Sequence, residues 1–256
     1  MIHPTAIVHS GAKLAADVEI GPYVLIGEHV EIASGSSIGS HTVLTGHTRI
    51  GRSNRIFQHC VLGGAPQDKK YAGEPTRLEI GEGNMIREFC TFNTGTVQDV
   101  GVTRMGNNNW IMAYVHLAHD VQIGSHTTLA NSAQFAGHVV VEDYAVVGGV
   151  TGVHQFCRIG AHAMVGAASL VLADVPPYVM AIGNSCEPRG INAEGLRRRG
   201  FTPETISAIR RAYRTLYKSG LSLEEAKQAL RGQVAACPEL AIFVEFLDSS
   251  KRSIIR

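Results

Sequence analysis

One segment of the sequence gathers side chains that could do chemistry. The run HLAHD at residues 116–120 is the densest polar cluster in an otherwise aliphatic stretch, and His138 and His154 follow 19 and 35 residues after His119. An imidazole gains and loses its proton near neutral pH, so such a cluster suits general acid–base catalysis. The same histidines could bind zinc, although no cysteine or glutamate completes an obvious ligand set.

A six-residue repeat decides which elements must position these side chains. Every sixth residue is apolar over residues 2–62 and 80–92, and again, after a shift of one residue, over residues 105–171. A period of six fits neither an α-helix nor an amphipathic strand. It predicts short strands joined by tight turns, in coils that stack because one repeat cannot bury a core alone. Three repeats, about eighteen residues, make one coil, so the histidines can lie close together on neighbouring coils.

The repeat is interrupted twice and then stops. Residues 65–77 and 95–104 break it, and such insertions leave a solenoid as loops, often on its binding face. Pro176-Pro177 marks the boundary between a repeat domain over residues 1–176 and a second domain over residues 177–256. In that second domain, capping signals predict a helix over 202–219, a second beginning near Ser222 and a third near Pro238.

Composition excludes several classes of function. A formal net charge of +1 over 256 residues gives no reason to expect a nucleic-acid partner. No apolar run is long enough to cross a membrane, and the first residues do not resemble a signal peptide. The five cysteines are scattered without CxxC spacing, which favours reduced thiols in a cytoplasmic protein.

Several motifs occur in an order and spacing that resemble one enzyme family along essentially the whole chain. Besides HLAHD they are QDKKY with GEPT in the first insertion, AGH at 136–138, VHQFC at 153–157, DVPPY at 174–178 and NAEGLRRRGF at 192–201. The chain resembles the hexapeptide-repeat UDP-N-acetylglucosamine O-acyltransferases of lipid A biosynthesis. The resemblance implies an all-β solenoid, a left-handed parallel β-helix of hexapeptide repeats with a small C-terminal α-helical domain. It also implies a homotrimer with active sites between neighbouring subunits.

The same resemblance implies a reaction and roles for individual residues. A 3-hydroxyacyl group would pass from acyl carrier protein to the 3-hydroxyl of UDP-N-acetylglucosamine, with no cofactor or metal. His119 would be the general base, Asp120 would orient it, and the backbone N–H of Gly137 would stabilise the oxyanion. The residues implied to bind substrate are Asp68, Lys70, His116, His138, His154 and Gln155 around the sugar and acyl group, and Asn192, Glu194, Arg198 and Arg199 at the nucleotide.

Two positions depart from the pattern of that family. Asn93-Thr94 stands where the family often has histidine and arginine, and asparagine can form hydrogen bonds but carries no charge. Ala167 stands at the position that limits acyl length, where glycine is common among long-chain enzymes. Other classes remain open at this level: another hexapeptide N-acyl or acetyl transferase, a zinc-dependent protein like the γ-carbonic anhydrases, or a silent scaffold.

Overall fold

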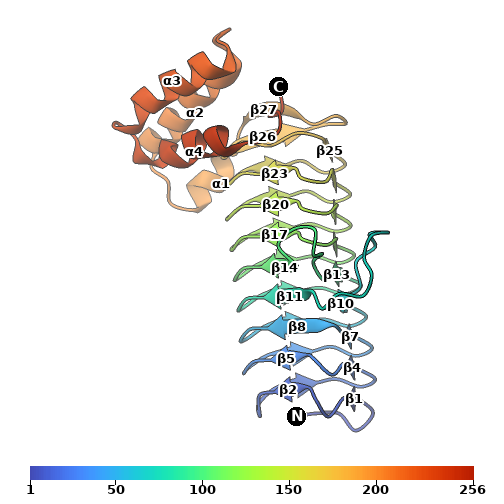
Figure 1. Ribbon diagram of the computed structural model, residues 1–256. Coiled ribbons are helices and arrows are strands. Elements are labelled where there is room, and N and C mark those ends of the chain that lie inside the picture. Colours follow the sequence, from blue (N-terminus) through green and yellow to red (C-terminus); the bar gives the residue numbers. More distant parts are fainter.

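The computed structural model describes all 256 residues as a left-handed parallel β-helix that ends in a small helical domain (Figure 1). Each coil contributes one short strand to each of three sheets, which we call faces I, II and III. Face I contains β1 (Ile7–Val8), β4 (Leu25–Ile26), β7 (Val43–Leu44), β10 (Val61–Gly64), β13 (Thr91–Asn93), β16 (His116–Leu117), β19 (Gln134–Phe135), β22 (Gly152–Val153) and β25 (Leu170–Val171).

In the other two faces the strands also follow one another in sequence order along the stack. Face II contains β2 (Lys13–Leu14), β5 (Glu31–Ile32), β8 (His47–Ile50), β11 (Arg77–Ile80), β14 (Val102–Met105), β17 (Gln122–Ile123), β20 (Val140–Val141) and β23 (Arg158–Ile159). Face III contains β3 (Glu19–Ile20), β6 (Ser37–Ile38), β9 (Arg55–Ile56), β12 (Met85–Ile86), β15 (Trp110–Ile111), β18 (Thr128–Leu129), β21 (Val146–Val147), β24 (Met164–Val165), β26 (Val179–Ile182) and β27 (Glu187–Ile191).

The predicted inward column of apolar residues is the core of the coil. Leu117, Phe135 and Val153 pair in register on successive coils of face I, and all three are buried. The corners between the faces carry residues with positive φ, a conformation that costs most L-residues roughly 1–2 kcal/mol. At the corner between faces I and II these residues include Asp120 (φ 59°), His138 (φ 63°) and Phe156 (φ 63°), so the corner backbone determines where their side chains point.

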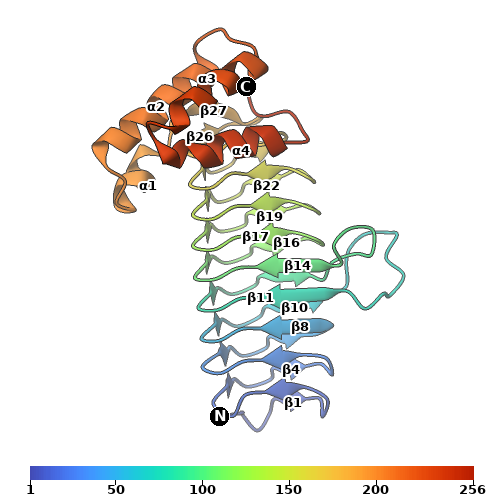
Figure 2. The same cartoon turned by 60° about the vertical axis from the view of Figure 1, so that its left-hand side comes forward.

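The two interruptions of the repeat become loops on the same side of the coil, with the second loop shorter than predicted (Figure 2). Residues 65–76 join β10 to β11, and residues 94–101 join β13 to β14; residues 102–104, which the repeat break had included, belong to β14. The hydroxyls of Thr76 and Thr94 lie 3.1 Å apart, which joins the two loops at their bases.

Strand structure continues beyond the proline pair at residues 176–177. β26 pairs parallel to β24 and antiparallel to β27, so the solenoid is extended through residue 191. This extension follows no six-residue register. Instead, Val179 and Ala181, which are two residues apart, are both buried, as expected for the period of two of an ordinary strand.

The C-terminal helices pack beside the top of the coil (Figure 1). They are α1 (Ala193–Arg198), α2 (Pro203–Tyr217), α3 (Leu223–Val234), the 3₁₀ turn η1 (Pro238–Leu240) and α4 (Ala241–Ser249). Thr202 caps α2, and Ser222 with Glu225 forms the predicted capping box of α3. The short helix α1 was not predicted from the sequence.

None of the helices is both long enough and apolar enough to cross a membrane. All five cysteines are buried, and none is in a disulfide.

Candidate active site

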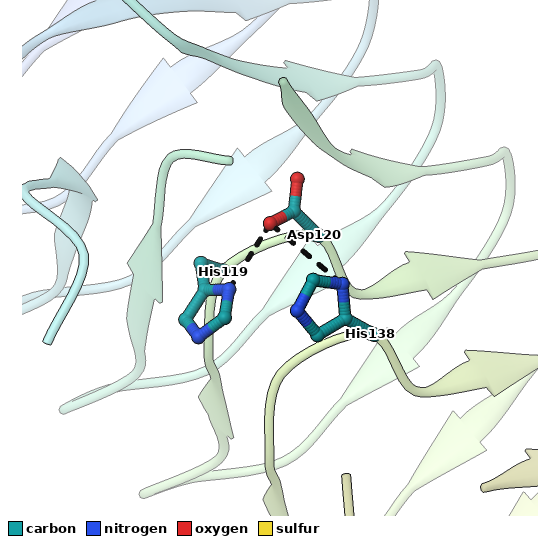
Figure 3. A group of neighbouring side chains, drawn as sticks. All are labelled: His119, Asp120 and His138. Atoms are coloured by element: carbon teal, nitrogen blue, oxygen red, sulfur yellow. Dashed lines mark hydrogen bonds and ion pairs between the residues drawn. The ribbon is translucent and has the colours of Figure 1, made fainter. Parts of the chain in front are cut away.

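His119 and Asp120 occupy the corner between faces I and II, directly after β16. Their side chains face the same space because they lie in the turn rather than along a strand. His119 Nδ1 and Asp120 Oδ2 are 3.0 Å apart, and Figure 3 shows the carboxylate between the imidazoles of His119 and His138. With Nδ1 donating to the carboxylate, Nε2 of His119 keeps its lone pair and can accept a proton.

The carboxylate of Asp120 is fully buried and held from several directions. It accepts hydrogen bonds from the backbone N–H of Thr96 at 3.0 Å and from the Thr96 hydroxyl at 2.6 Å. The backbone N–H of Asp120 donates to the hydroxyl of Thr103 at 2.9 Å. Both threonines come from the second loop or the strand that follows it, so this loop fixes the acid that contacts His119.

The next coil places Gly137 and His138 directly above these two residues. A Cβ built on Gly137 would lie 2.5 Å from His119 Cε1 and 2.6 Å from Nε2, so only glycine leaves room for the imidazole. The backbone N–H of Gly137 donates to no protein acceptor. A free N–H beside a candidate base has the chemistry required of an oxyanion donor.

His138 is oriented by contacts on three sides. Its ring stacks on Phe156 of the following coil, with centroids 4.3 Å apart, and meets the His119 ring edge-on. Its Nδ1 lies 2.6 Å from Oδ2 of Asp99, in the second loop. Sequence reasoning missed Asp99 and Thr96; the only available signal was that this loop interrupts the repeat one coil before HLAHD.

His116 lies on face I, just before the corner. Its Nδ1 is 2.8 Å from the hydroxyl of Thr91, and burial lowers the pKa of its imidazole. A neutral imidazole held in this way can accept a hydrogen bond from an uncharged group of the substrate or donate one to it.

The first loop carries Asp68 and Lys70. The Asp68 carboxylate accepts the backbone N–H of Lys70 at 2.9 Å, and the Lys70 side chain is exposed without an ion pair. Asn93 is buried and donates to the carbonyl of Ala65 at 3.0 Å, so it ties the beginning of this loop to the coil. Its own Oδ1 has no partner.

His154 and Gln155 lie on the coil above Gly137, and both are exposed. Gln155 is 36 residues, or two coils, above His119 in the same corner column. Strands in a sheet are about 4.8 Å apart, so Gln155 lies roughly 10 Å along the stack from the base. Residues 119, 120, 137 and 138 are thus in contact at this corner, residues 154 and 155 continue the same column above them, and residue 116 lies beside it on face I.

The residues predicted to bind the nucleotide lie at a different corner, between faces II and III. Asn192 is buried; it caps α1 and donates to the carbonyl of His162 at 3.0 Å. Arg199 donates to the carbonyl of Tyr144 at 2.7 Å and lies over the Tyr144 ring, while its Nη1 has no partner. In contrast, Glu194 and Arg198 are more than half exposed and pair with each other.

This second corner contains a stack of aromatic rings. His162 lies between Tyr144 and Tyr178, with centroid separations of 4.8 Å and 5.6 Å. Burial, with a smaller effect of the Arg199 charge, lowers the pKa of His162 to about 4. The imidazole is therefore neutral at physiological pH, and its Nδ1 has no partner.

Ala167 lies at the third corner, between faces III and I, and it is exposed. The predicted base, the predicted nucleotide residues and Ala167, the residue predicted to limit acyl length, thus occupy three different corners of one chain. A single chain does not bring them together.

One group of side chains has the geometry to hold a metal ion. His119, Asp120 and His138 offer ligand atoms that all lie within 4.8 Å of one another. Asp120 already accepts hydrogen bonds from Thr96 and contacts His119 directly, so a metal would have to replace these bonds. The arrangement supports acid–base chemistry without further rearrangement.

Comparisons with known proteins give a consistent result. The family model described as UDP-N-acetylglucosamine O-acyltransferase, domain 2, matches residues 174–255, and the bacterial transferase hexapeptide model matches residues 103–137. An acyl-[acyl-carrier-protein]–UDP-N-acetylglucosamine O-acyltransferase of Thiobacillus denitrificans is 60% identical over 255 residues, covering 100% of this chain and 99% of that protein.

Solved structures agree with the sequence relatives. LpxA of Acinetobacter baumannii superposes with a TM-score of 0.97 at 46% identity, covering 100% of this chain and 99% of that one. The UDP-N-acetylglucosamine acyltransferase of Francisella novicida gives 0.98 at 44% identity, covering 100% and 94%. With its coil, its helical domain and the histidine corner all in place, the chain belongs to the family of acyl-[acyl-carrier-protein]–UDP-N-acetylglucosamine O-acyltransferases.

Proposed function

We propose that this enzyme transfers a 3-hydroxyacyl group from acyl carrier protein to the 3-hydroxyl of UDP-N-acetylglucosamine, in lipid A biosynthesis. The relatives that match the whole chain are named for this O-acyl transfer. The observation that carries the mechanism is the 3.0 Å contact between His119 and Asp120, with the free N–H of Gly137 beside it. These three residues supply a base, a group that orients it and an oxyanion donor.

In the first step, Nε2 of His119 takes the proton of the sugar hydroxyl while that oxygen attacks the thioester carbonyl. Asp120 stabilises the imidazolium that forms, since its carboxylate accepts a hydrogen bond from the Nδ1–H group of His119 and stays ionised. Such proton transfer contributes typically about 10²–10⁴-fold to the rate. The carbonyl oxygen becomes negatively charged and accepts a hydrogen bond from the N–H of Gly137.

In the second step, the tetrahedral intermediate collapses and the carbon–sulfur bond breaks. The departing thiolate takes the proton from Nε2 of His119, which yields the free thiol of the carrier and an ester on the sugar. The imidazole returns to its neutral form, so no cofactor is consumed.

We also propose a homotrimer. The substrate-binding residues assigned to the sugar lie at one corner, and Arg198 lies at another. A neighbouring chain with threefold symmetry would bring a second corner toward the first, as oligomers with shared sites do. Five buried, unpaired thiols support a reducing compartment, and we place the reaction in the cytoplasm.

The direct test is product analysis by mass spectrometry. Purified protein is incubated with UDP-N-acetylglucosamine and 3-hydroxyacyl carrier proteins of several chain lengths, and acetyl-CoA replaces the carrier in a parallel reaction. We expect an O-acylated sugar nucleotide only with the carrier protein. Product from acetyl-CoA alone would point instead to an acetyltransferase.

A further inference from the structure

The active-site corner contains a second carboxylate–imidazole pair. Asp99 Oδ2 lies 2.6 Å from His138 Nδ1, a short contact in which the carboxylate accepts a charge-assisted hydrogen bond from the ring. The His138 side chain is only 14% exposed, whereas that of Asp99 is 43% exposed. The acid therefore lies on the solvent side of the ring and covers one of its nitrogens.

Asp120 does not form such a hydrogen bond with His138. Its Oδ2 is 3.9 Å from His138 Nδ1, beyond hydrogen-bond distance, and the same oxygen contacts His119 and the Thr96 hydroxyl. Each of the two imidazoles thus has its own carboxylate. A carboxylate on Nδ1 keeps the proton there, so Nε2 becomes the acceptor.

One loop supports both pairs. Thr96 holds the carboxylate of Asp120 through its N–H and hydroxyl, and three residues later Asp99 contacts His138. The backbone N–H of Asp99 donates to the carbonyl of Thr96 at 3.3 Å, which closes a turn between the two. The loop is therefore attached to the corner at both functional contacts.

We propose that Asp99 is a positioning residue for the acceptor sugar. It holds His138 in the tautomer protonated on Nδ1, and Nε2, which lies on the His119 side of the ring in Figure 3, then accepts a hydrogen bond from a sugar hydroxyl. The Phe156 stack keeps the ring in this plane. The inference rests on the proposed function, because it assigns the ligand of His138 to the acceptor of that reaction.

The first measurement tests the tautomer without any catalysis. Ring ¹⁵N signals of His138 are recorded above neutral pH in the wild type, in Asp99→Ala and in Gln98→Ala, with assignment from His138→Asn. Gln98 is an exposed neighbour with no side-chain hydrogen bond, so its variant is the matched control. We expect the Nδ1-protonated form in the wild type and the control, and a mixture of tautomers in Asp99→Ala. Identical signals in all three proteins would overturn the proposal.

The second measurement is a double-mutant cycle in the acyl-transfer assay. Asp99→Ala should raise KM for UDP-N-acetylglucosamine about 10-fold with a smaller change in kcat, and Asp99→Asn should restore part of the loss. In a His138→Asn background, Asp99→Ala should have no further effect; asparagine suits this site because it tolerates positive φ. Additive effects would remove Asp99 from this role. A wild type that transfers no acyl group would contradict the proposed function but leave the tautomer result intact.

Discussion

The imidazole of His119 lies against the Cα of Gly137 so closely that a methyl group on that glycine would come within 2.5 Å of the ring. Gly137 is not among the residues with positive φ, so alanine could adopt its backbone conformation without strain. The constraint on this position is therefore the volume of the neighbouring ring. Coils about 4.8 Å apart place the glycine of one coil over the histidine of the coil below.

Gly137→Ala should inactivate the enzyme without unfolding it. The added methyl must push His119 away from Asp120, and we expect a loss of about 10²-fold or more in kcat, as when a catalytic donor or base is displaced. Gly232→Ala is the control, since a Cβ there meets nothing within 4 Å and alanine favours a helix. Near-normal kcat in Gly137→Ala would show that the ring can move without cost.

His119→Ala should lower turnover by roughly 10²-fold or more with folding intact, because it removes the proposed base. His116→Ala should have a milder effect, since His116 contacts Thr91 and is assigned to positioning. Single-turnover rates with saturating substrates separate chemistry from binding. If the folded His119→Ala protein turned over at a rate close to wild type, another group would have to be the base.

The sequence predicted the coil because its signal is local. Each six-residue repeat contains its own inward residue and its own turn, so stacking at eighteen-residue intervals follows directly. His138 could be placed near His119 on this basis alone. Asp99 and Thr96 could not, because the second loop breaks the register and nothing in its composition specifies how it folds back onto the corner.

The residues predicted to bind the nucleotide show a different limit of prediction from sequence. The resemblance predicts that Asn192 and Arg199 bind the nucleotide, and this stays a prediction; in this chain Asn192 also caps α1, and Arg199 also donates to the carbonyl of Tyr144. A sequence motif does not reveal whether a polar side chain faces a ligand or its own backbone. That distinction depends on contacts between α1 and the coil, which are remote in sequence.

Arg198 and Arg199 should therefore behave differently. Arg198→Ala should raise KM for UDP-N-acetylglucosamine with little change in melting temperature, because this side chain is 77% exposed and pairs only with Glu194. Arg199→Ala should also lower the melting temperature, since it removes the contact with Tyr144. Arg197→Ala is the control, as Arg197 also pairs with Glu194. Lower kcat with unchanged sugar affinity in Arg198→Ala would contradict the nucleotide assignment.

His162 should make the protein less stable in mild acid. Its pKa is about 4 in the fold and near 6.5 in an unfolded chain, so between these values the unfolded state binds more protons. Stability from this group is fully present above pH 6.5 and is lost as pH falls toward 4. His162→Phe keeps an aromatic ring between the two tyrosines and removes the titration. The difference in melting temperature between pH 7 and pH 5 should be smaller in this variant, and an equal difference would show that other groups dominate.

The last prediction concerns the length of the acyl chain. Ala167 adds one methyl relative to glycine, and in a tight apolar pocket a single methylene discriminates by about 1–3 kcal/mol, or about 10–200-fold. We expect this enzyme to prefer a somewhat shorter acyl chain than a variant with glycine there. Ala167→Gly should shift selectivity toward longer donors, and Ala167→Met toward shorter ones.

The position of Ala167 makes this experiment a test of assembly as well. Ala167 is exposed at the corner between faces III and I, so its own chain has room for methionine and offers no closed pocket to measure an acyl chain. Residue 167 can limit the length of the acyl chain only if a second chain covers it. Its side chain would then lie among closely packed groups that cannot easily move. Competition between donors of different length, together with a measurement of the oligomeric state of each variant, tests both the role of residue 167 and the shared site. If all three proteins were trimers and gave the same product distribution, residue 167 would not set the chain length; if they were active monomers, the shared site itself would be wrong.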